Sequence, residues 1–166
     1  MKIYLDNIDA FIFDFDGVLT NNHVLISESG KESVNCSRAD GLAFDVLNKL
    51  NKPTYIMSTE KNSVVEVRAK KLKVPVLQGV NNKVEAMIEL ANLKSYNLEN
   101  ILYIGNDLND YLVMQLCGYT ACPADSHPKI KEIATFRLEK NGGSGILREI
   151  LEEIFKLNLL ELLYSN

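Results

Sequence analysis

The sequence predicts a single α/β domain over residues 1–166, in which a central parallel sheet lies between two layers of helices and a small β-hairpin stands apart. Short apolar runs rich in β-branched and aromatic residues alternate along the chain with stretches of helical spacing. Strands that alternate with helices in this way form parallel sheets that are covered on both faces. A length of 166 residues with 46% hydrophobic residues suits one domain with a buried core.

Six apolar runs are predicted to be the strands of the sheet: residues 8–13, 54–57, 74–77, 101–104, 119–121 and 135–138. The intervening helices are predicted over residues 42–50, 64–72, 84–93 and 108–116, with a last helix from about residue 146. Residues 24–26 and 33–36 flank the polar segment Glu28-Ser29-Gly30-Lys31, which predicts the hairpin. The segment Asn141-Gly-Gly-Ser-Gly145 is typical of a loop, and the amphipathic tail at 154–164 is expected to pack on the body or on another subunit.

The overall charge narrows the class of partner. A net charge of −4 and a pI near 5.2 argue against nucleic acid and against an anionic membrane surface. Cys36, Cys117 and Cys122 show no metal-ligand spacing and are expected to be free thiols, which suits a reducing compartment. With neither a signal-like start nor an uninterrupted apolar span in the sequence, we expect a cytoplasmic protein that binds neither nucleic acid nor membrane.

Polar residues follow the predicted strands at the points where they end. Ligands bind beyond the carboxyl ends of parallel strands, so these positions are the candidate site. The first strand is followed by Asp14, Asp16 and Gly17, the second by Ser58, Thr59 and Glu60, and the fourth by Gly105, Asn106, Asp107 and Asp110, while Lys83 opens a helix after the third.

The pair Asp14 and Asp16 points to phosphate chemistry. Two acids this close repel unless a divalent cation or a shared proton lies between them, and Mg²⁺ is the hard cation that accompanies phosphate. One carboxylate can attack phosphorus to give an aspartyl-phosphate, and the other can protonate the leaving oxygen and later activate water. Ser58 would bind a phosphoryl oxygen and Lys83 would balance charge. A capping turn at the acid pair, a turn serine and a solvated lysine are the alternatives.

These residues together resemble the motifs of the haloacid dehalogenase (HAD) superfamily of phosphohydrolases. The resemblance rests on Asp14-Phe-Asp16-Gly-Val-Leu-Thr20, Ser58, Lys83 and Gly105-Asn-Asp-Leu-Asn-Asp110, in that order. It implies a Rossmann-like three-layer sandwich, with Asp14 as nucleophile and Asp16 as general acid and base. It also implies that Mg²⁺ is held by Asp14, the main-chain carbonyl of Asp16 and an acid of the last motif.

The last motif departs from the family pattern, which begins Gly-Asp. Asn106 occupies the acid's position, and an amide oxygen can ligate Mg²⁺ but carries no charge. Asn106 and Asp107 are therefore the predicted ligands beside Asp14 and Asp16. Asp107 or Asp110 would compensate for the missing charge, directly or through water.

The intervals between the motifs leave no room for the cap domain that many HAD proteins insert, so the chain is expected to be capless. Nearly the whole chain resembles the tetrameric, capless phosphatases of sugar-acid phosphates. That resemblance implies a homotetramer. The hairpin at 24–36 is its expected interface, because edge strands tend to be paired or covered, and the alternative is an ordinary surface hairpin.

Within this subfamily, Glu60 and Lys71 resemble the branch that acts on nine-carbon 2-keto-3-deoxy (sialic-acid-like) 9-phosphates more than the branch that acts on 3-deoxy-octulosonate 8-phosphate. Arg68 and Lys71 share one helix face and could meet a sugar carboxylate, or else are merely solvated. The predicted substrate contacts are Gly17, Thr59, Glu60, Arg68 and Lys71.

Two other classes of protein share parts of this pattern. A response-regulator receiver needs a phosphoaccepting Asp after the third strand, and residues 74–80 contain none. A non-catalytic assembly module, like the related domains fused to sialic acid cytidylyltransferases, stays open because Asn106 alters the last motif. The leading prediction is an Mg²⁺-dependent phosphatase.

Overall fold

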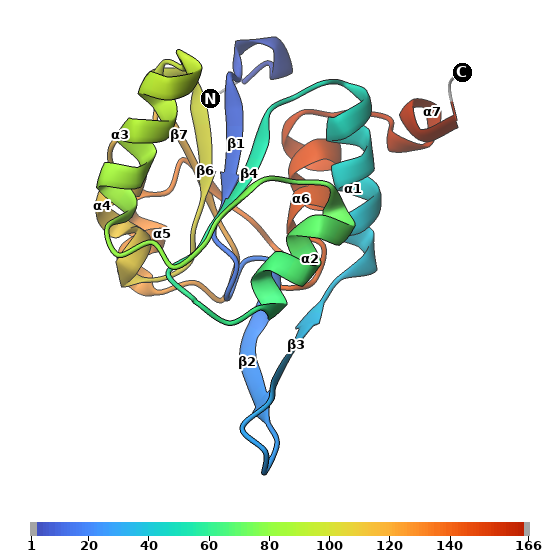
Figure 1. Cartoon of the computed structure of the whole chain (residues 1–166). Helices are drawn as coiled ribbons and strands as arrows, with labels where there is room; N and C mark the ends of the chain where they lie inside the picture. The colour runs from blue at the N-terminus through green and yellow to red at the C-terminus, as the bar shows by residue number, and fades with distance from the viewer. Residues whose placement is uncertain (1–2, 165–166) are drawn as a thin grey trace.

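The computed structural model describes residues 3–164, which form a three-layer α/β sandwich with a projecting hairpin (Figure 1). A six-stranded parallel sheet, in the order β5-β4-β1-β6-β7-β8, is the middle layer. Its strands are β1 (Ala10–Phe13), β4 (Thr54–Met57), β5 (Val76–Leu77), β6 (Ile101–Ile104), β7 (Tyr119–Cys122) and β8 (Phe136–Arg137). The predicted fold class is confirmed.

Strand β1 lies in the middle of the sheet and sets the position of the site. Its last residue, Phe13, pairs with Ile56 of β4 on one side and Ile104 of β6 on the other. Because the three strands are parallel and end within one residue of one another, the residues that follow them emerge side by side at one edge of the sheet.

Helices cover both faces of the sheet (Figure 1). Phe11 and Phe13 of β1 face one apolar core, and Ala10 and Ile12 face the other, as alternation along a strand requires. The first core is closed by α1 (Arg38–Lys49), α2 (Val64–Leu72), α6 (Ile146–Glu149) and the π-helical turn Ile150–Ile154, and the second by α3 (Lys83–Lys94), α4 (Tyr111–Met114) and α5 (Pro128–Ile133).

The last helix, α7 (Leu159–Tyr164), packs on the body of the chain, which is one of the two positions predicted for the tail. Leu159 is buried in the first core, and Lys49 of α1 donates to the carbonyl of Leu163 at 2.7 Å. Among residues 3–164, no helix is long and apolar enough to cross a membrane. The three cysteines are free, as predicted.

The hairpin consists of β2 (Thr20–Ile26) and β3 (Glu32–Cys36), which form their own antiparallel sheet and project away from the body (Figure 1). Strand β2 begins four residues earlier than predicted. The register shifts between Thr20 and Val24, and this irregularity lets the start of the strand pair with Cys36. Polar residues such as Asn21 and Asn22 hide this extension in the sequence.

Other helices and strands begin or end at residues that differ from the prediction, for local reasons. Helix α1 begins at Arg38, because Ser37 caps it by accepting from the amide of Ala39 at 3.1 Å. The helix predicted at 108–116 is a 3-10 turn (Leu108–Asp110) followed by the short α4. The strands predicted at 8–13, 74–77 and 135–138 are shorter, and the one at 119–121 is one residue longer. Pro75, which has no N–H, lies outside β5, and its carbonyl accepts from Ile56.

Candidate active site

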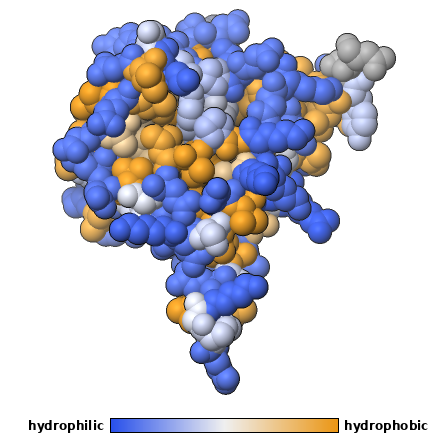
Figure 2. Space-filling model, in the orientation of Figure 1, coloured by the Kyte–Doolittle hydropathy of each residue, from blue (hydrophilic) through white to orange (hydrophobic). Residues whose placement is uncertain are grey.

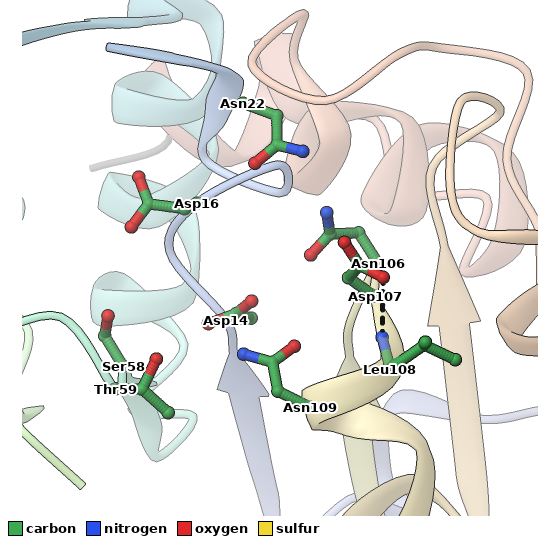
Figure 3. Close-up of a pocket in the computed structure, with 9 residues that line it drawn as sticks. All are labelled: Asp14, Asp16, Asn22, Ser58, Thr59, Asn106, Asp107, Leu108 and Asn109. Carbon is green, nitrogen blue, oxygen red and sulfur yellow. Dashed lines mark hydrogen bonds between the residues drawn. The ribbon is translucent and has the colours of Figure 1, made fainter.

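The ends of β1, β4 and β6 meet at an open cavity of about 330 Å³. Its lining comes from the segments after these strands and from the start of β2, and Figure 3 shows the side chains around the hollow. The lining residues are Asp14, Asp16, Asn22, Ser58, Thr59, Asn106, Asp107, Leu108 and Asn109. Asp14, Asp16 and Ser58 therefore share one cavity, as the strand ends predict.

Asp14 and Lys83 form a buried ion pair at the base of this site. Nζ of Lys83 lies 2.8 Å from Oδ1 of Asp14 and 2.6 Å from Oδ1 of Asp110. Lys83 is the first residue of α3, and Asn82 caps that helix by accepting from the amide of Val84 at 3.0 Å. The helix start thus fixes the ammonium group between two carboxylates.

Asp110 holds the ammonium group of Lys83 in place and does not line the cavity. Oδ1 accepts from Lys83 and, at 2.8 Å, from the hydroxyl of Tyr103, while Oδ2 accepts from the amide of Asn106 at 2.9 Å. The side chain is fully buried. Because both oxygens are engaged, Asp110 holds Lys83 and the turn after β6, and does not replace the charge that Asn106 lacks.

Burial sets the protonation of this cluster. Burial, followed by repulsion from Asp110, raises the pKa of Asp14 to about 8, although Lys83 opposes the rise. For Lys83, burial alone would lower the pKa, but Asp14 and Asp110 together outweigh it and raise the pKa above its ordinary value. Lys83 is therefore a fixed cation, and a further cation near Asp14 would favour the carboxylate form.

Asp16 lies half-buried on the turn that leaves β1. Burial, followed by the nearby Glu60 carboxylate, raises the pKa of Asp16, while the Thr20 hydroxyl, 3.4 Å from Oδ1, opposes the rise. The same hydroxyl accepts from the amides of Gly17 and Asn22 at 3.1 and 3.2 Å. A carboxyl group with a raised pKa on the wall of a cavity can carry a proton to a leaving group.

Asp14, Asp16 and Asn106 offer a set of oxygen donors. The Asn106 amide places one terminal atom 2.9 Å from the main-chain carbonyl of Asp16 and 3.2 Å from Oδ2 of Asp14. With oxygen at that atom, the separations match the edge of about 3 Å between neighbouring ligands of octahedral Mg²⁺, whose bonds are 2.0–2.1 Å. Among residues 3–164, no three His, Cys, Asp or Glu side chains group as metal ligands, and here two of the three donors are an amide and a carbonyl. The residues present fit Mg²⁺.

Gly17 allows the Asn106 side chain to come this close to Asp14 and Asp16. Its φ is +79°, and a Cβ at this position would collide with the side chain of Asn106. The predicted ligand Asp107 also lines the cavity, although one of its carboxylate oxygens accepts from the amide of Leu108 at 2.7 Å (Figure 3).

Ser58 and Thr59 directly follow β4 at the cavity wall, where both were predicted. Ser58 is buried, and its Oγ accepts from the amide of Glu60 at 3.1 Å, which leaves the hydroxyl hydrogen for a ligand. Glu60 turns its carboxylate to its own loop, where Oε1 accepts from the amides of Lys61 and Asn62 at 2.6 and 2.8 Å. Glu60 is near Asp16 but does not line the cavity.

Arg68 and Lys71 lie elsewhere. Both line a hollow of about 500 Å³ between β3 and α2, and Arg68 donates to the carbonyl of Ser37 at 2.8 Å. Within one chain they are not brought to Asp14, so their contact with substrate stays a prediction.

Three lining residues were missed from the sequence: Asn22, Leu108 and Asn109. Asn22 has a left-handed backbone (φ 61°) where the register of β2 shifts, and Asn tolerates this conformation better than most residues. The position of Asn109 in the motif after β6 was a signal that could have identified it.

Comparison with known proteins agrees with this geometry. Residues 48–150 match the family of haloacid dehalogenase-like hydrolases. The chain is 31% identical to 3-deoxy-D-manno-octulosonate 8-phosphate phosphatase of Salmonella typhi over 148 residues, which is 89% of this chain and 79% of the relative. The Escherichia coli K12 protein of the same name is 30% identical over the same shares.

Solved structures show the same fold. A HAD family hydrolase from Streptomyces avermitilis superimposes with a TM-score of 0.92 at 37% identity, covering 96% of this chain and 91% of that one. The 3-deoxy-D-manno-octulosonate 8-phosphate phosphatase of Moraxella catarrhalis, solved with magnesium ion, phosphate ion and a KDO molecule, gives 0.86 at 26% identity, covering 90% and 87%.

The fold and the site define a hydrolase of the α/β class. The chain belongs to the haloacid dehalogenase-like hydrolase family, as its motifs predicted. The predictions of a HAD-type phosphatase and of Mg²⁺, the cofactor of HAD phosphatases, are confirmed at the level of this family.

Proposed function

We propose that the chain hydrolyses a sugar-acid phosphate through an aspartyl-phosphate on Asp14. The observation that carries this proposal is the contact between the Asp14 carboxylate and Lys83 at 2.8 Å, at the base of a cavity that also holds Asp16 and Ser58. A buried carboxylate beside a fixed cation and an open cavity is placed for nucleophilic attack.

The side chains divide the reaction between them. The Asp14 carboxylate attacks phosphorus, the bond from phosphorus to the sugar oxygen breaks, and Asp16 gives its proton to that oxygen. Asp16 then takes a proton from water as the water attacks the phosphorus of the aspartyl-phosphate, which releases phosphate and restores Asp14. Lys83 balances the charge of Asp14, and the Ser58 hydroxyl donates to a phosphoryl oxygen.

Asp14, the carbonyl of Asp16 and Asn106 would hold Mg²⁺, with Asp107 joining through water. The ion supplies positive charge to the phosphoryl oxygens. All of the named donors border the cavity, so this proposal adds no group from elsewhere in the chain.

The substrate proposed first is 3-deoxy-D-manno-octulosonate 8-phosphate, because curated relatives at 30–31% identity carry that name. A nine-carbon 2-keto-3-deoxy acid 9-phosphate is the second candidate, because Glu60 and Lys71 resemble the branch that acts on such esters. Relative to the first, it has one more carbon between the carboxylate and the phosphate ester.

We also propose a homotetramer in which the hairpin meets a neighbouring chain. Val24, Leu25 and Ile26 lie on β2 and are 48%, 74% and 62% exposed, and Figure 2 shows apolar surface on the projecting hairpin. Covering these side chains would remove apolar area from water and roof an open site. Light scattering should give the tetramer mass, and a monomer at working concentration would refute the arrangement.

A catalytically weak assembly domain is the rival function, favoured by Asn106. The deciding experiment measures phosphate release from a panel of eight- and nine-carbon sugar-acid phosphates, with and without Mg²⁺. The wild type should release phosphate only when Mg²⁺ is present. The Asp14→Asn variant should release none, with or without Mg²⁺. No metal-dependent release from any ester would favour the assembly domain, while the ratio between the two esters decides the substrate.

A further inference from the structure

The three proposed metal ligands are the Asn106 amide oxygen, Oδ2 of Asp14 and the carbonyl oxygen of Asp16. When no cation is bound, these oxygens lie close together with nothing to balance their negative charge. In one orientation of the amide, its oxygen faces Oδ2 of Asp14 at 3.2 Å and the carbonyl oxygen of Asp16 at 2.9 Å. When Asp14 is ionised, three acceptors then face one another without a hydrogen, and buried acceptors without a donor are costly.

A half-turn of the amide group removes the problem. The nitrogen then occupies the same place and donates to both oxygens, at 2.9 Å to the Asp16 carbonyl and 3.2 Å to Asp14. The oxygen orientation suits a bound cation, and the nitrogen orientation suits its absence.

The surroundings fix the Asn106 backbone while leaving this choice to the side chain. Its N–H donates to Oδ2 of Asp110 at 2.9 Å, and its carbonyl accepts from the amide of His127 at 2.9 Å. The amide group lies against Gly17, where there is no Cβ to obstruct it. Only the terminal torsion has to change between the two orientations.

We infer that the Asn106 amide closes the cation site from within: its nitrogen bridges Asp14 and Asp16 in the metal-free protein, and Mg²⁺ binding turns its oxygen inward. This inference rests on the metal site proposed above. An aspartate cannot play the first role, because an ionised carboxylate only accepts hydrogen bonds. Asn106 therefore stabilises the metal-free chain and weakens Mg²⁺ binding.

The test compares Asn106→Asp with Asn109→Asp. Asn109 lines the same cavity and receives the same added charge, but it is not one of the three converging donors. In EDTA at about pH 9, where Asp14 is ionised, N106D should melt about 3–8 °C below N109D, because its carboxylate faces two acceptors. N106D should also bind Mg²⁺ at least about tenfold more tightly than N109D by calorimetry, since only N106D adds its charge to the donor set.

A second measurement follows the amide itself by NMR. In the wild type without metal, the Asn106 NH₂ protons should be protected from solvent exchange, and Mg²⁺ should shift them and increase their exchange. Free exchange in EDTA together with normal Mg²⁺ binding, or equal melting of N106D and N109D, would overturn the inference while leaving the metal site intact. If Mg²⁺ neither binds nor moves this signal, the proposed metal site itself fails.

Discussion

The ammonium of Lys83 lies 2.8 Å from the carboxylate of Asp14, and both side chains are almost entirely withdrawn from solvent, at 2% and 5% exposure. The pair belongs to a line of three charges, since Asp110 holds Lys83 from the other side at 2.6 Å. Two carboxylates with one cation between them depend on that cation for stability as well as for reactivity.

The Lys83→Met variant should therefore lose both folding stability and phosphatase activity. Removing the cation leaves two buried carboxyl groups with no positive charge between them, which should cost about 3–5 kcal/mol of folding free energy. Phosphate release should fall by a factor of about 10²–10³ because the charge of Asp14 and the transferring group is no longer balanced. Urea unfolding and phosphate release measure the two effects.

The double variant Lys83→Met/Asp110→Asn is the control. It removes one of the two stranded carboxylates while keeping an acceptor for Tyr103. It should regain part of the stability and none of the activity. A single K83M variant as stable as the wild type would contradict the ion-pair argument.

Mg²⁺ binding should depend on pH through Asp14. Since burial raises the pKa of Asp14 to about 8, the metal-free chain keeps a proton there at neutral pH, and the ion must displace it. The apparent affinity should rise by up to about tenfold per pH unit from about pH 6 to about pH 7.5, then flatten near the pKa. Calorimetry in buffers of different ionisation enthalpy should show about one proton released per ion.

The same raised pKa predicts the stability of the metal-free protein. A carboxyl group whose pKa is higher in the folded chain than in the unfolded chain stabilises the fold fully below the unfolded value, and this contribution is lost as pH rises toward about 8. Asp14→Asn should remove this loss, so it should melt above the wild type at about pH 8 in EDTA. If D14N and wild type show the same pH dependence, Asp14 is ionised in the folded chain at lower pH than we expect.

The proton on Asp16 should respond to Thr20 and Glu60. The Thr20 hydroxyl lowers the pKa of Asp16 and the Glu60 carboxylate raises it. Thr20→Val should move the basic limb of the kcat profile to higher pH, and Glu60→Gln should move it to lower pH, each by a few tenths of a unit. Thr20→Ser keeps the hydroxyl and should leave the limb in place. Shifts in the same direction for T20V and E60Q would remove Asp16 from the role of general acid.

The parts of the site that were predictable follow from sheet geometry. Parallel strands end at one edge, so Asp14 and Ser58 could be placed together from the order of apolar runs alone. The contact between Lys83 and Asp14 depends on the same rule, but the role of Asp110 does not. Its burial against Tyr103 arises from packing between α3, β6 and the turn after β6, which no local pattern in the sequence reports.

The hairpin shows the limit of such reasoning. Alternation located its apolar part, but the register shift between Thr20 and Val24 is set by pairing with β3 and not by the residue types. The shift brings Asn22 to the cavity. Arg68 and Lys71 lie on one helix face as expected, yet the hollow that they line depends on where the hairpin leaves the body.

Asn22 provides a test of this missed part of the site. Its side chain lines the cavity from the hairpin, and its backbone is left-handed with φ 61° (Figure 3). Asn22→Gly keeps that conformation without strain and removes only the amide, so KM should rise by about three- to tenfold while kcat changes little. Asn22→Ala adds strain at positive φ and should lower the free energy of unfolding by about 1 kcal/mol relative to N22G.

Asn21→Ala is the matched control one residue away, where the side chain accepts from the amide of His23 instead of lining the cavity. Steady-state kinetics and thermal melts of the three variants separate binding from folding, and an unchanged KM in N22G would show that the substrate does not reach this side of the cavity.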